Sequence, residues 1–201
     1  YGAPSVPEVL DRLTAAGVSR ILLLPMYPQY SASTTATVID EACNWLLTRR
    51  NQPEMRFVRN FHDDQGYIEA VEQTVRNHWM RHGPLASGDQ LIISFHGLPR
   101  RNLDLGDPYY CECMKTGRLL AERLNLRPEQ YRICFQSRFG KAEWLQPYTA
   151  PTLEALAKAG TRRVDMICPG FIADCLETLE EIAIEGKTSF LASGGKEYHY
   201  I

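Results

Sequence analysis

The sequence predicts an α/β protein in which a parallel sheet is covered by helices on both faces. Short apolar runs alternate with longer amphipathic runs along the chain. The apolar runs contain few charged residues, which is typical of strands that are buried on both faces. Strands that alternate with helices in this way form parallel sheets with right-handed crossovers.

The predicted strands are runs of five to seven residues rich in Ile, Leu, Val, Met and Phe, and most of them end at turn or polar residues. They cover 20–25, 55–61, 90–95, 131–136 and 164–168. Between them, apolar residues recur every three or four positions, which predicts helices. These cover 6–16, 35–49, 67–82, 111–124, 149–159 and 172–184.

A polar stretch at 48–54, which contains Pro53, indicates a domain boundary. We expect residues 1–47 to be the end of an N-terminal α/β domain with a connecting helix. Residues 48–201 are expected to form a C-terminal α/β domain with four strands, incomplete at its C-terminus.

The composition excludes several classes of protein. The chain is 44% hydrophobic and 23% charged, which is typical of a folded globular domain. Its net charge of -2 provides no basic surface for nucleic acid. No apolar run has the length of a membrane span. The six scattered cysteines do not resemble a disulfide framework, so we expect reduced thiols and a cytoplasmic protein.

Two predicted strands end at side chains suited to proton and metal chemistry. The run L-I-I-S-F-H-G-L-P places His96 at a strand end, with Gly97 leaving room beside it. Another strand leads into the helix at 172–184, where Glu177 lies. Ligands of parallel sheets bind beyond the carboxyl ends of the strands, so His96 and Glu177 can meet there and handle protons and a metal. The alternative for His96 is an ordinary hydrogen-bonded histidine.

The same predicted helix has an apolar face and an opposite carboxylate face, each made of residues three or four positions apart. By itself this pattern indicates a solvated surface helix, and the functional alternative is a file of carboxylates that passes a cation or protons inward. The carboxylate face holds Asp174, Glu177, Glu181 and Glu185, and the apolar face holds Ile172, Leu176, Leu179 and Ala183.

Two further stretches follow strands. The stretch F-Q-S-R-F-G-K-A-E-W carries Ser137 and Trp144, which suit a flat anionic ligand unless Trp144 only fills the core. The turn Y-P-Q-Y-S-A-S-T-T-A-T brings Tyr30 and several hydroxyls to another strand end, where a binding site is expected. The alternative is that the hydroxyls only cap the helix that follows. His78 and His82 are four residues apart, a zinc-binding spacing, but without an H-E-x-x-H motif we expect exposed helix histidines.

Six motifs in order resemble those of bacterial ferrochelatases: L-P-M-Y-P-Q-Y-S-A-S-T-T, S-F-H-G-L-P, G-D-P-Y, F-Q-S-R-F-G-K-A-E-W-L-Q-P-Y-T, C-P-G-F-I-A-D-C-L-E-T-L-E-E-I and G-G-K-E-Y-H-Y-I. The resemblance implies two similar domains, each a four-stranded parallel sheet flanked by helices, with a porphyrin cleft between them. It also implies that this chain holds one such domain and the tail of the other, so we expect the fragment alone to be inactive.

The activity implied by the resemblance is insertion of Fe²⁺ into protoporphyrin IX, which gives protohaem and releases two protons, a lyase reaction of haem biosynthesis. His96 matches the residue that accepts pyrrole protons. Glu177 matches its partner in metal binding or proton removal, and both are expected metal ligands. Glu181 and Glu185 match an acidic line that leads outward along the helix.

The resemblance also implies a porphyrin pocket and the partners of the protein. Trp144 matches a tryptophan that lines the pocket, and we expect Tyr109, Tyr30 and Ser137 around it. Ala32 stands where some relatives have a cysteine for an iron–sulfur cluster, which argues against that cluster here. The expected substrates are protoporphyrin IX and ferrous iron, with no further cofactor.

Several alternatives stay open at this point. A chelatase of the same fold could act on sirohydrochlorin or coproporphyrin, and a haem or porphyrin carrier could use the same residues without catalysis. The sequence also leaves open the oligomeric state and a peripheral contact with the membrane.

Overall fold

The computed structural model describes residues 2–201. The chain forms two compact units, which we call the first unit (Tyr1–Phe61) and the second unit (His62–Ile201). We describe each unit by itself. The boundary between them differs from the one expected after residue 47, because residues 48–61 remain with the first unit.

The first unit contains α1 (Val6–Ala15), β1 (Arg20–Leu23), α2 (Thr35–Leu47) and β2 (Glu54–Phe57). β1 and β2 pair in parallel, with Ile21 opposite Met55. The expected strand at 55–61 therefore belongs to this unit and not to the four-stranded sheet. The physical reason is that Met55 and Phe57 pack against an apolar cluster built on Trp45 and neighbouring helix residues.

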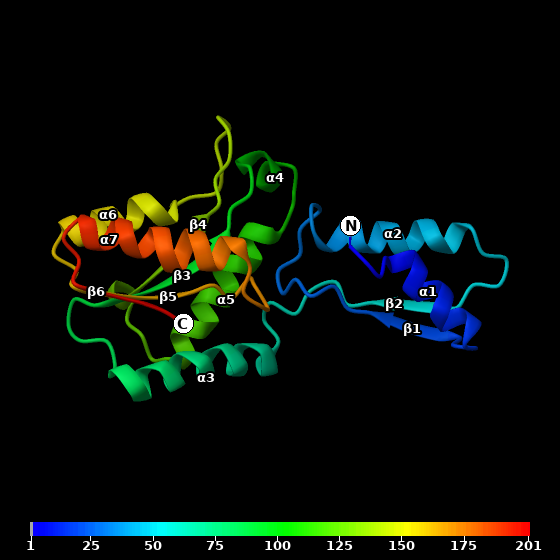
Figure 1. Ribbon diagram of the computed structural model, residues 1–201, viewed down its shortest axis with the longest axis horizontal. Helices are drawn as coiled ribbons and strands as arrows, with labels where there is room; N and C mark the ends of the chain where they lie inside the picture. Colours follow the sequence, from blue (N-terminus) through cyan, green and yellow to red (C-terminus); the bar gives the residue numbers. More distant parts are fainter. Residues whose placement is uncertain (1) are drawn as a thin grey trace. The chain divides into compact units, whose positions relative to one another are not determined.

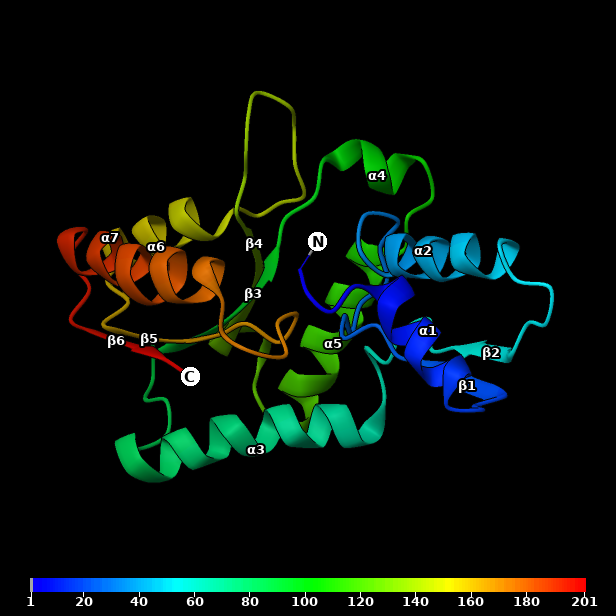
Figure 2. The same cartoon turned by 45° about the vertical axis from the view of Figure 1, so that its right-hand side comes forward.

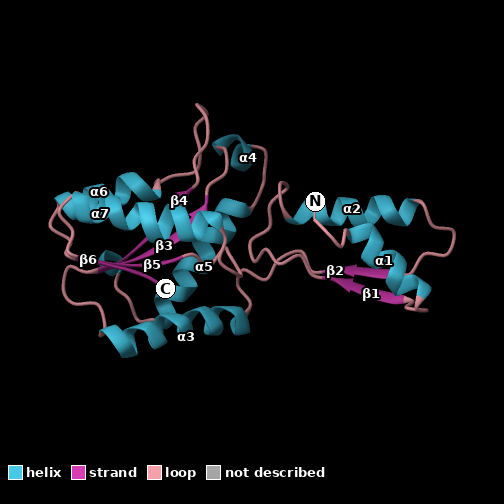
Figure 3. Ribbon diagram, viewed as in Figure 1, coloured by secondary structure: helices cyan, strands magenta, loops and turns pink. Residues whose placement is uncertain are grey.

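The second unit is built on a sheet of four parallel strands in the order β4-β3-β5-β6 (Figures 1 and 3). Its strands are β3 (Gln90–His96), β4 (Tyr131–Gln136), β5 (Arg163–Ile167) and β6 (Glu197–Tyr200). Its helical segments are α3 (Gln65–His82), α4 (Arg100–Asp104), α5 (Tyr109–Arg123), η1 (Pro128–Gln130), α6 (Thr149–Lys158), η2 (Glu177–Gly186) and α7 (Lys187–Ala192). The edge strand β6 was not predicted. Among residues 2–201, no helix combines the length and the apolar character needed to cross a bilayer.

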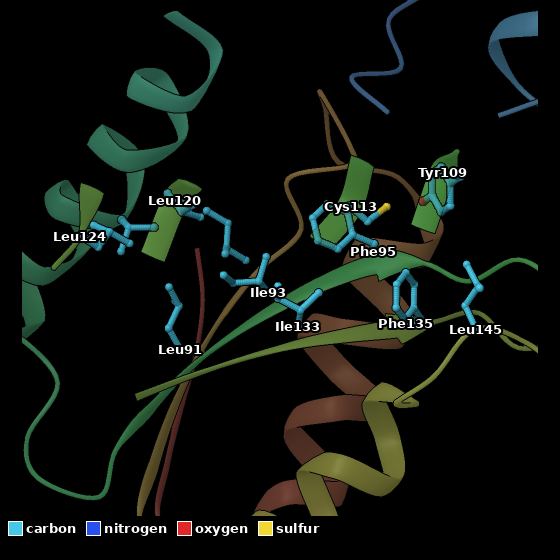
Figure 4. Packing of buried hydrophobic residues seen from close by; sticks show 12 residues of the cluster. Leu91, Ile93, Phe95, Tyr109, Cys113, Leu120, Leu124, Ile133, Phe135 and Leu145 are labelled. Atoms are coloured by element: carbon cyan, nitrogen blue, oxygen red, sulfur yellow. The ribbon is translucent and has the colours of Figure 1, made fainter. Parts of the chain in front are cut away.

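Alternating side chains of the central strand β3 reach two separate apolar layers. Leu91, Ile93 and Phe95 pack into a cluster with side chains of α3 and α5 (Figure 4). Ile92 points the other way, into a cluster with side chains of α6, η2 and α7. Because successive side chains of a strand alternate between its faces, this arrangement buries β3 on both sides. The predicted parallel sheet covered on two faces is therefore confirmed.

The helix expected at 172–184 differs in the structure. The helix η2 starts at Glu177 and is a π-helix, whose hydrogen bonds join residues five apart. Its buried residues are Thr178, Ile182 and Gly186, which are four apart. The expected apolar stripe does not face the core, since three of its members are 45%, 70% and 47% exposed: Ile172, Leu176 and Leu179.

Candidate active site

His96 is the last residue of β3 and is half-buried at the carboxyl edge of the sheet. Its Nδ1 lies 2.6 Å from the carbonyl oxygen of Gly97. A carbonyl oxygen only accepts hydrogen bonds, so in the neutral ring Nδ1 carries the proton and Nε2 keeps its lone pair. The rings of Trp144 and Phe171 each lie 6.4 Å from the imidazole, measured between ring centroids. The site therefore offers a base with two aromatic rings nearby.

Gly97 allows the chain to pass close to β4 directly after His96. Its N–H donates to the carbonyl of Gln136 at 2.8 Å. A Cβ atom at this position would lie 2.7 Å from that carbonyl oxygen and 3.1 Å from the ring of Trp144. Only glycine fits between this backbone oxygen and the indole.

We expect Gly97→Ala to lower the free energy of unfolding by about 1–3 kcal/mol, because the added methyl group overpacks a contact with backbone. Urea denaturation of the full-length protein measures this change. Gly66→Ala is the control, since a Cβ there lies 3.2 Å from only the Asp64 side chain in the first turn of α3. Equal stabilities of the two variants would contradict the expected crowding.

Gln136 links the three strand ends around the site. Its Nε2 donates to the carbonyl of Glu177 at 2.7 Å. Its Oε1 accepts from the hydroxyl of Ser94 at 2.8 Å and from the thiol of Cys168 at 3.5 Å. Gln136 therefore fixes the first residue of η2 relative to β3 and β4. The sequence analysis did not assign it this role, and the only signal was a polar residue that ends an apolar strand.

Glu177 is half-buried and begins η2. A hydrogen bond from the Cys175 thiol, assisted by the backbone N–H of Glu177 itself, holds the pKa of this carboxyl below its usual value. A positive charge on His96 lowers this pKa further. Glu177 is therefore an ionised carboxylate at neutral pH, and its backbone carbonyl is hydrogen-bonded to Gln136, the residue opposite His96 in the sheet.

Glu181 lies one step further along the same row of η2. Its two carboxylate oxygens accept from the backbone N–H and the hydroxyl of Ser137, both at 2.6 Å. Ser137 adopts the left-handed backbone conformation, with φ of 62°, directly after β4. Glu181 and the exposed Glu185 line a pocket of about 260 Å³ between α6 and η2. Asp174 does not join this row, because it precedes η2 and accepts from Tyr200 at 2.6 Å.

The four predicted pocket residues occupy four different environments. Trp144 is half-buried near His96 at the base of the arm, residues 137–148, which extends beyond the strand ends (Figure 2). Tyr109 is buried, and its hydroxyl donates to the carbonyl of His96 at 2.9 Å, so it supports the strand end from within the core. Ser137 holds Glu181. Tyr30 belongs to the first unit, where the guanidinium of Arg59 lies 4.1 Å from its ring centroid.

The Ser/Thr-rich turn in the first unit precedes α2 without capping it through the N-cap side chain. Its N-cap residue Thr34 makes no capping hydrogen bond through its side chain. The hydroxyls of Thr34 and Thr35 are buried and have no hydrogen-bond partner among the described residues. These two hydroxyls therefore do not take part in capping α2.

The family model and the curated relatives that we compared match this chain over its whole length. The family model described as "Ferrochelatase" matches residues 1–201. The curated protein "Ferrochelatase" of Dechloromonas aromatica (strain RCB) is 73% identical over all 201 residues. The "Ferrochelatase" of Aromatoleum aromaticum (strain DSM 19018 / LMG 30748 / EbN1) is 63% identical over the same length. The chain covers 55% and 54% of these two proteins, so it spans about half the length of the curated relatives it matches.

Solved structures share the fold at low sequence identity. SirB from Bacillus subtilis with Fe³⁺ superposes with a TM-score of 0.72 at 14% identity, covering 99% of this chain and 71% of that one. The sirohydrochlorin chelatase SirB from Bacillus subtilis subspecies spizizenii in complex with cobalt gives a TM-score of 0.62 at 12% identity, covering 100% and 69%. These structures support the fold alone, whereas the sequence matches identify the family. The chain belongs to the ferrochelatase family.

Proposed function

We propose that the full-length protein containing this chain inserts Fe²⁺ into protoporphyrin IX, giving protohaem and two protons. It is then a lyase of haem biosynthesis. The observation that carries the proposal is the pair at the carboxyl edge of the sheet: His96 with a lone pair on Nε2, and the ionised Glu177. The high identity to proteins named ferrochelatase supports the same conclusion.

In this proposal each side chain has a separate role. His96 accepts a pyrrole proton at Nε2, while its Nδ1–H stays on the carbonyl of Gly97. Glu177 displaces water from the incoming iron, and its negative charge stabilises the imidazolium that forms. Glu181 and Glu185 continue the carboxylate row toward the surface and guide the hydrated ion or the released protons. Trp144 offers an aromatic face to the macrocycle.

The proposed reaction balances without a redox cofactor. Iron enters and remains as Fe²⁺, and two N–H bonds of the porphyrin are exchanged for bonds to iron with release of two protons. We therefore propose no cofactor beyond the substrate iron, and no iron–sulfur cluster at the turn that holds Ala32.

We also propose a cytoplasmic location and a peripheral contact with the membrane, and no binding of nucleic acid. All six cysteines are free thiols, which is typical of a reducing compartment. Phe139 on the arm is 83% exposed and Leu105 after α4 is 72% exposed. Exposed apolar side chains of this kind suit exchange of an apolar substrate with a lipid surface.

Glu177→Gln tests the role of the carboxylate. We expect anaerobic Fe²⁺ insertion into protoporphyrin IX by the full-length protein to fall about 100-fold or more, because a neutral amide neither accepts a proton nor replaces metal-bound water well. The absorbance change of the porphyrin measures the rate. Glu180→Gln, an exposed neighbour on η2, is the matched control and should retain the rate.

Two results would count against the proposal. If Glu177→Gln and Glu180→Gln have the same rate, Glu177 does not take part in the reaction. If the unsubstituted protein metallates sirohydrochlorin or coproporphyrin but not protoporphyrin, the substrate is wrong although the fold is right. Binding of porphyrin without any metallation would indicate a carrier.

A further inference from the structure

Three histidines from two distant parts of the chain lie together in the second unit. His78 and His82 are one turn apart on α3, and their rings stack with centroids 4.4 Å apart. The ring of His199 on β6 lies 4.9 Å from that of His78 and 4.8 Å from that of His82. One ring nitrogen of each lies within 4.8 Å of the others. The expectation of exposed helix histidines is wrong for His78, which is only 5% exposed.

The Nε2 atom of His78 has no hydrogen-bond partner among the described residues, although it is buried. The nearest carboxylate oxygen, on Asp165, is 3.9 Å away and therefore beyond hydrogen-bonding distance. Buried polar atoms without a partner are rare, because each loses its hydration without compensation. A neutral imidazole keeps a lone pair on one ring nitrogen, and a metal ion at Nε2 would give this buried atom the partner that it lacks.

The surroundings of the other two histidines suit the same ligand. The Nε2 of His199 lies 2.6 Å from a carboxylate oxygen of Glu197, which leaves Nδ1 as the free donor atom. A carboxylate that holds the second nitrogen is the usual arrangement around a metal-binding histidine. His82 is exposed, so an ion can reach the cluster from solvent. Asp165 adds a negative charge nearby, although Arg163 is paired with it.

The cluster is separate from the candidate active site. Arg163, the first residue of β5, donates to the carbonyl of His82 at 3.1 Å, so the end of α3 lies near the amino end of β5. His96 lies at the carboxyl end of β3, which is parallel to β5. Figure 1 shows α3 across one face of the sheet, with its C-terminal end toward the side of β6. The two sites therefore lie toward opposite ends of the strands.

We propose that His78, His82 and His199 bind one divalent first-row transition ion, such as Zn²⁺ or Co²⁺, with water as a fourth ligand. Imidazole nitrogens suit these ions, whereas Mg²⁺ and Ca²⁺ prefer oxygen ligands. Metal–nitrogen bonds of about 2.0–2.1 Å require the three nitrogens, now within 4.8 Å of one another, to move closer together when the ion binds. The ion ties the edge strand β6 to α3. The proposal does not depend on the proposed function.

The test uses Co²⁺ alone and the full-length protein that carries His96→Ala and Glu177→Gln, so that the candidate active site does not contribute. We expect this parent to bind Co²⁺ with the visible absorption of a tetrahedral site. Adding His82→Ala or His199→Ala should remove that absorption. Adding Glu197→Gln should weaken binding about 10–100-fold, because the carboxylate orients His199. Arg81→Ala, the exposed neighbour of His82 on α3, is the matched control and should bind like the parent.

A second measurement keeps the test decisive if a variant is less stable. Saturating Zn²⁺ should raise the Tm of the parent and of Arg81→Ala, because a ligand that binds the folded state stabilises it. The same Zn²⁺ should not raise the Tm of His82→Ala, which removes an exposed side chain and leaves the core intact. Absence of Co²⁺ absorption in the parent, or equal binding by the parent and His82→Ala, would overturn the proposal.

Discussion

Replacing His96 with alanine is expected to reduce the proposed Fe²⁺ insertion by the full-length protein about 10²–10⁴-fold, the usual contribution of a positioned general base. The reason is the single free lone pair at Nε2, which is set by the bond between Nδ1 and the carbonyl of Gly97. Alanine removes the base without disturbing Trp144 or the backbone that Tyr109 supports. Porphyrin affinity should therefore change little.

Rates are measured from the porphyrin absorbance under anaerobic conditions, and porphyrin binding is measured separately by quenching of tryptophan fluorescence. Arg101→Ala, an exposed substitution on the helix that follows His96, is the control and should keep both values. Retention of most of the rate by His96→Ala would show that another group removes the pyrrole protons. Loss of rate and binding together would instead assign His96 to binding.

The largest effect on stability is expected from Asp165→Ala, at about 3–5 kcal/mol. Asp165 is fully buried and accepts from Nε of Arg163 at 2.8 Å and from Nη2 of Arg163 at 2.9 Å. It also accepts from Nε1 of Trp79 at 2.8 Å. Removing this carboxylate leaves a buried guanidinium without its counter-charge and an indole without its acceptor. Urea denaturation of the full-length protein measures the loss.

A surface pair provides the comparison. Arg100 and Asp104 are both more than half exposed and lie 3.5 Å apart, so Asp104→Ala should change the free energy of unfolding by less than about 1 kcal/mol. The double variant Arg163→Met, Asp165→Leu should recover much of the loss, since it removes both buried charges. Similar losses for Asp165→Ala and Asp104→Ala would contradict the assigned role of the buried pair.

Apolar runs were sufficient to predict the strands of the second unit that are buried on both faces. β3, β4 and β5 match the predicted runs closely, because most of their side chains are apolar and buried. β6 was missed, because its four residues alternate tyrosine with charged or titratable side chains at the sheet edge. The placement of β2 was missed for another reason: an apolar run shows that a strand is buried but not which neighbour it pairs with.

The helix after β5 shows a different limit of sequence reasoning. The spacing of its apolar residues suggested an α-helix from residue 172, whereas the chain forms the π-helix η2 from Glu177. The hydroxyl of Tyr198 explains part of this outcome. It donates to the carbonyl of Ile182 at 2.5 Å, and a Cβ on Gly186 would lie 2.7 Å from it. Contacts of this kind, between residues far apart in the sequence, determine which face of η2 is buried. The spacing of apolar residues along the helix does not reveal them.

The α/β class, the family and the positions of His96 and Glu177 after buried strands follow from the sequence without a structure. These depend on patterns along the chain, namely apolar runs, turn residues and ordered motifs. Three contacts became visible only in the folded chain: Gln136 holds the start of η2, Ser137 holds Glu181, and His199 meets two histidines of α3. Such contacts depend on strand order, parallel register and helix packing, which bring together residues that no local pattern relates.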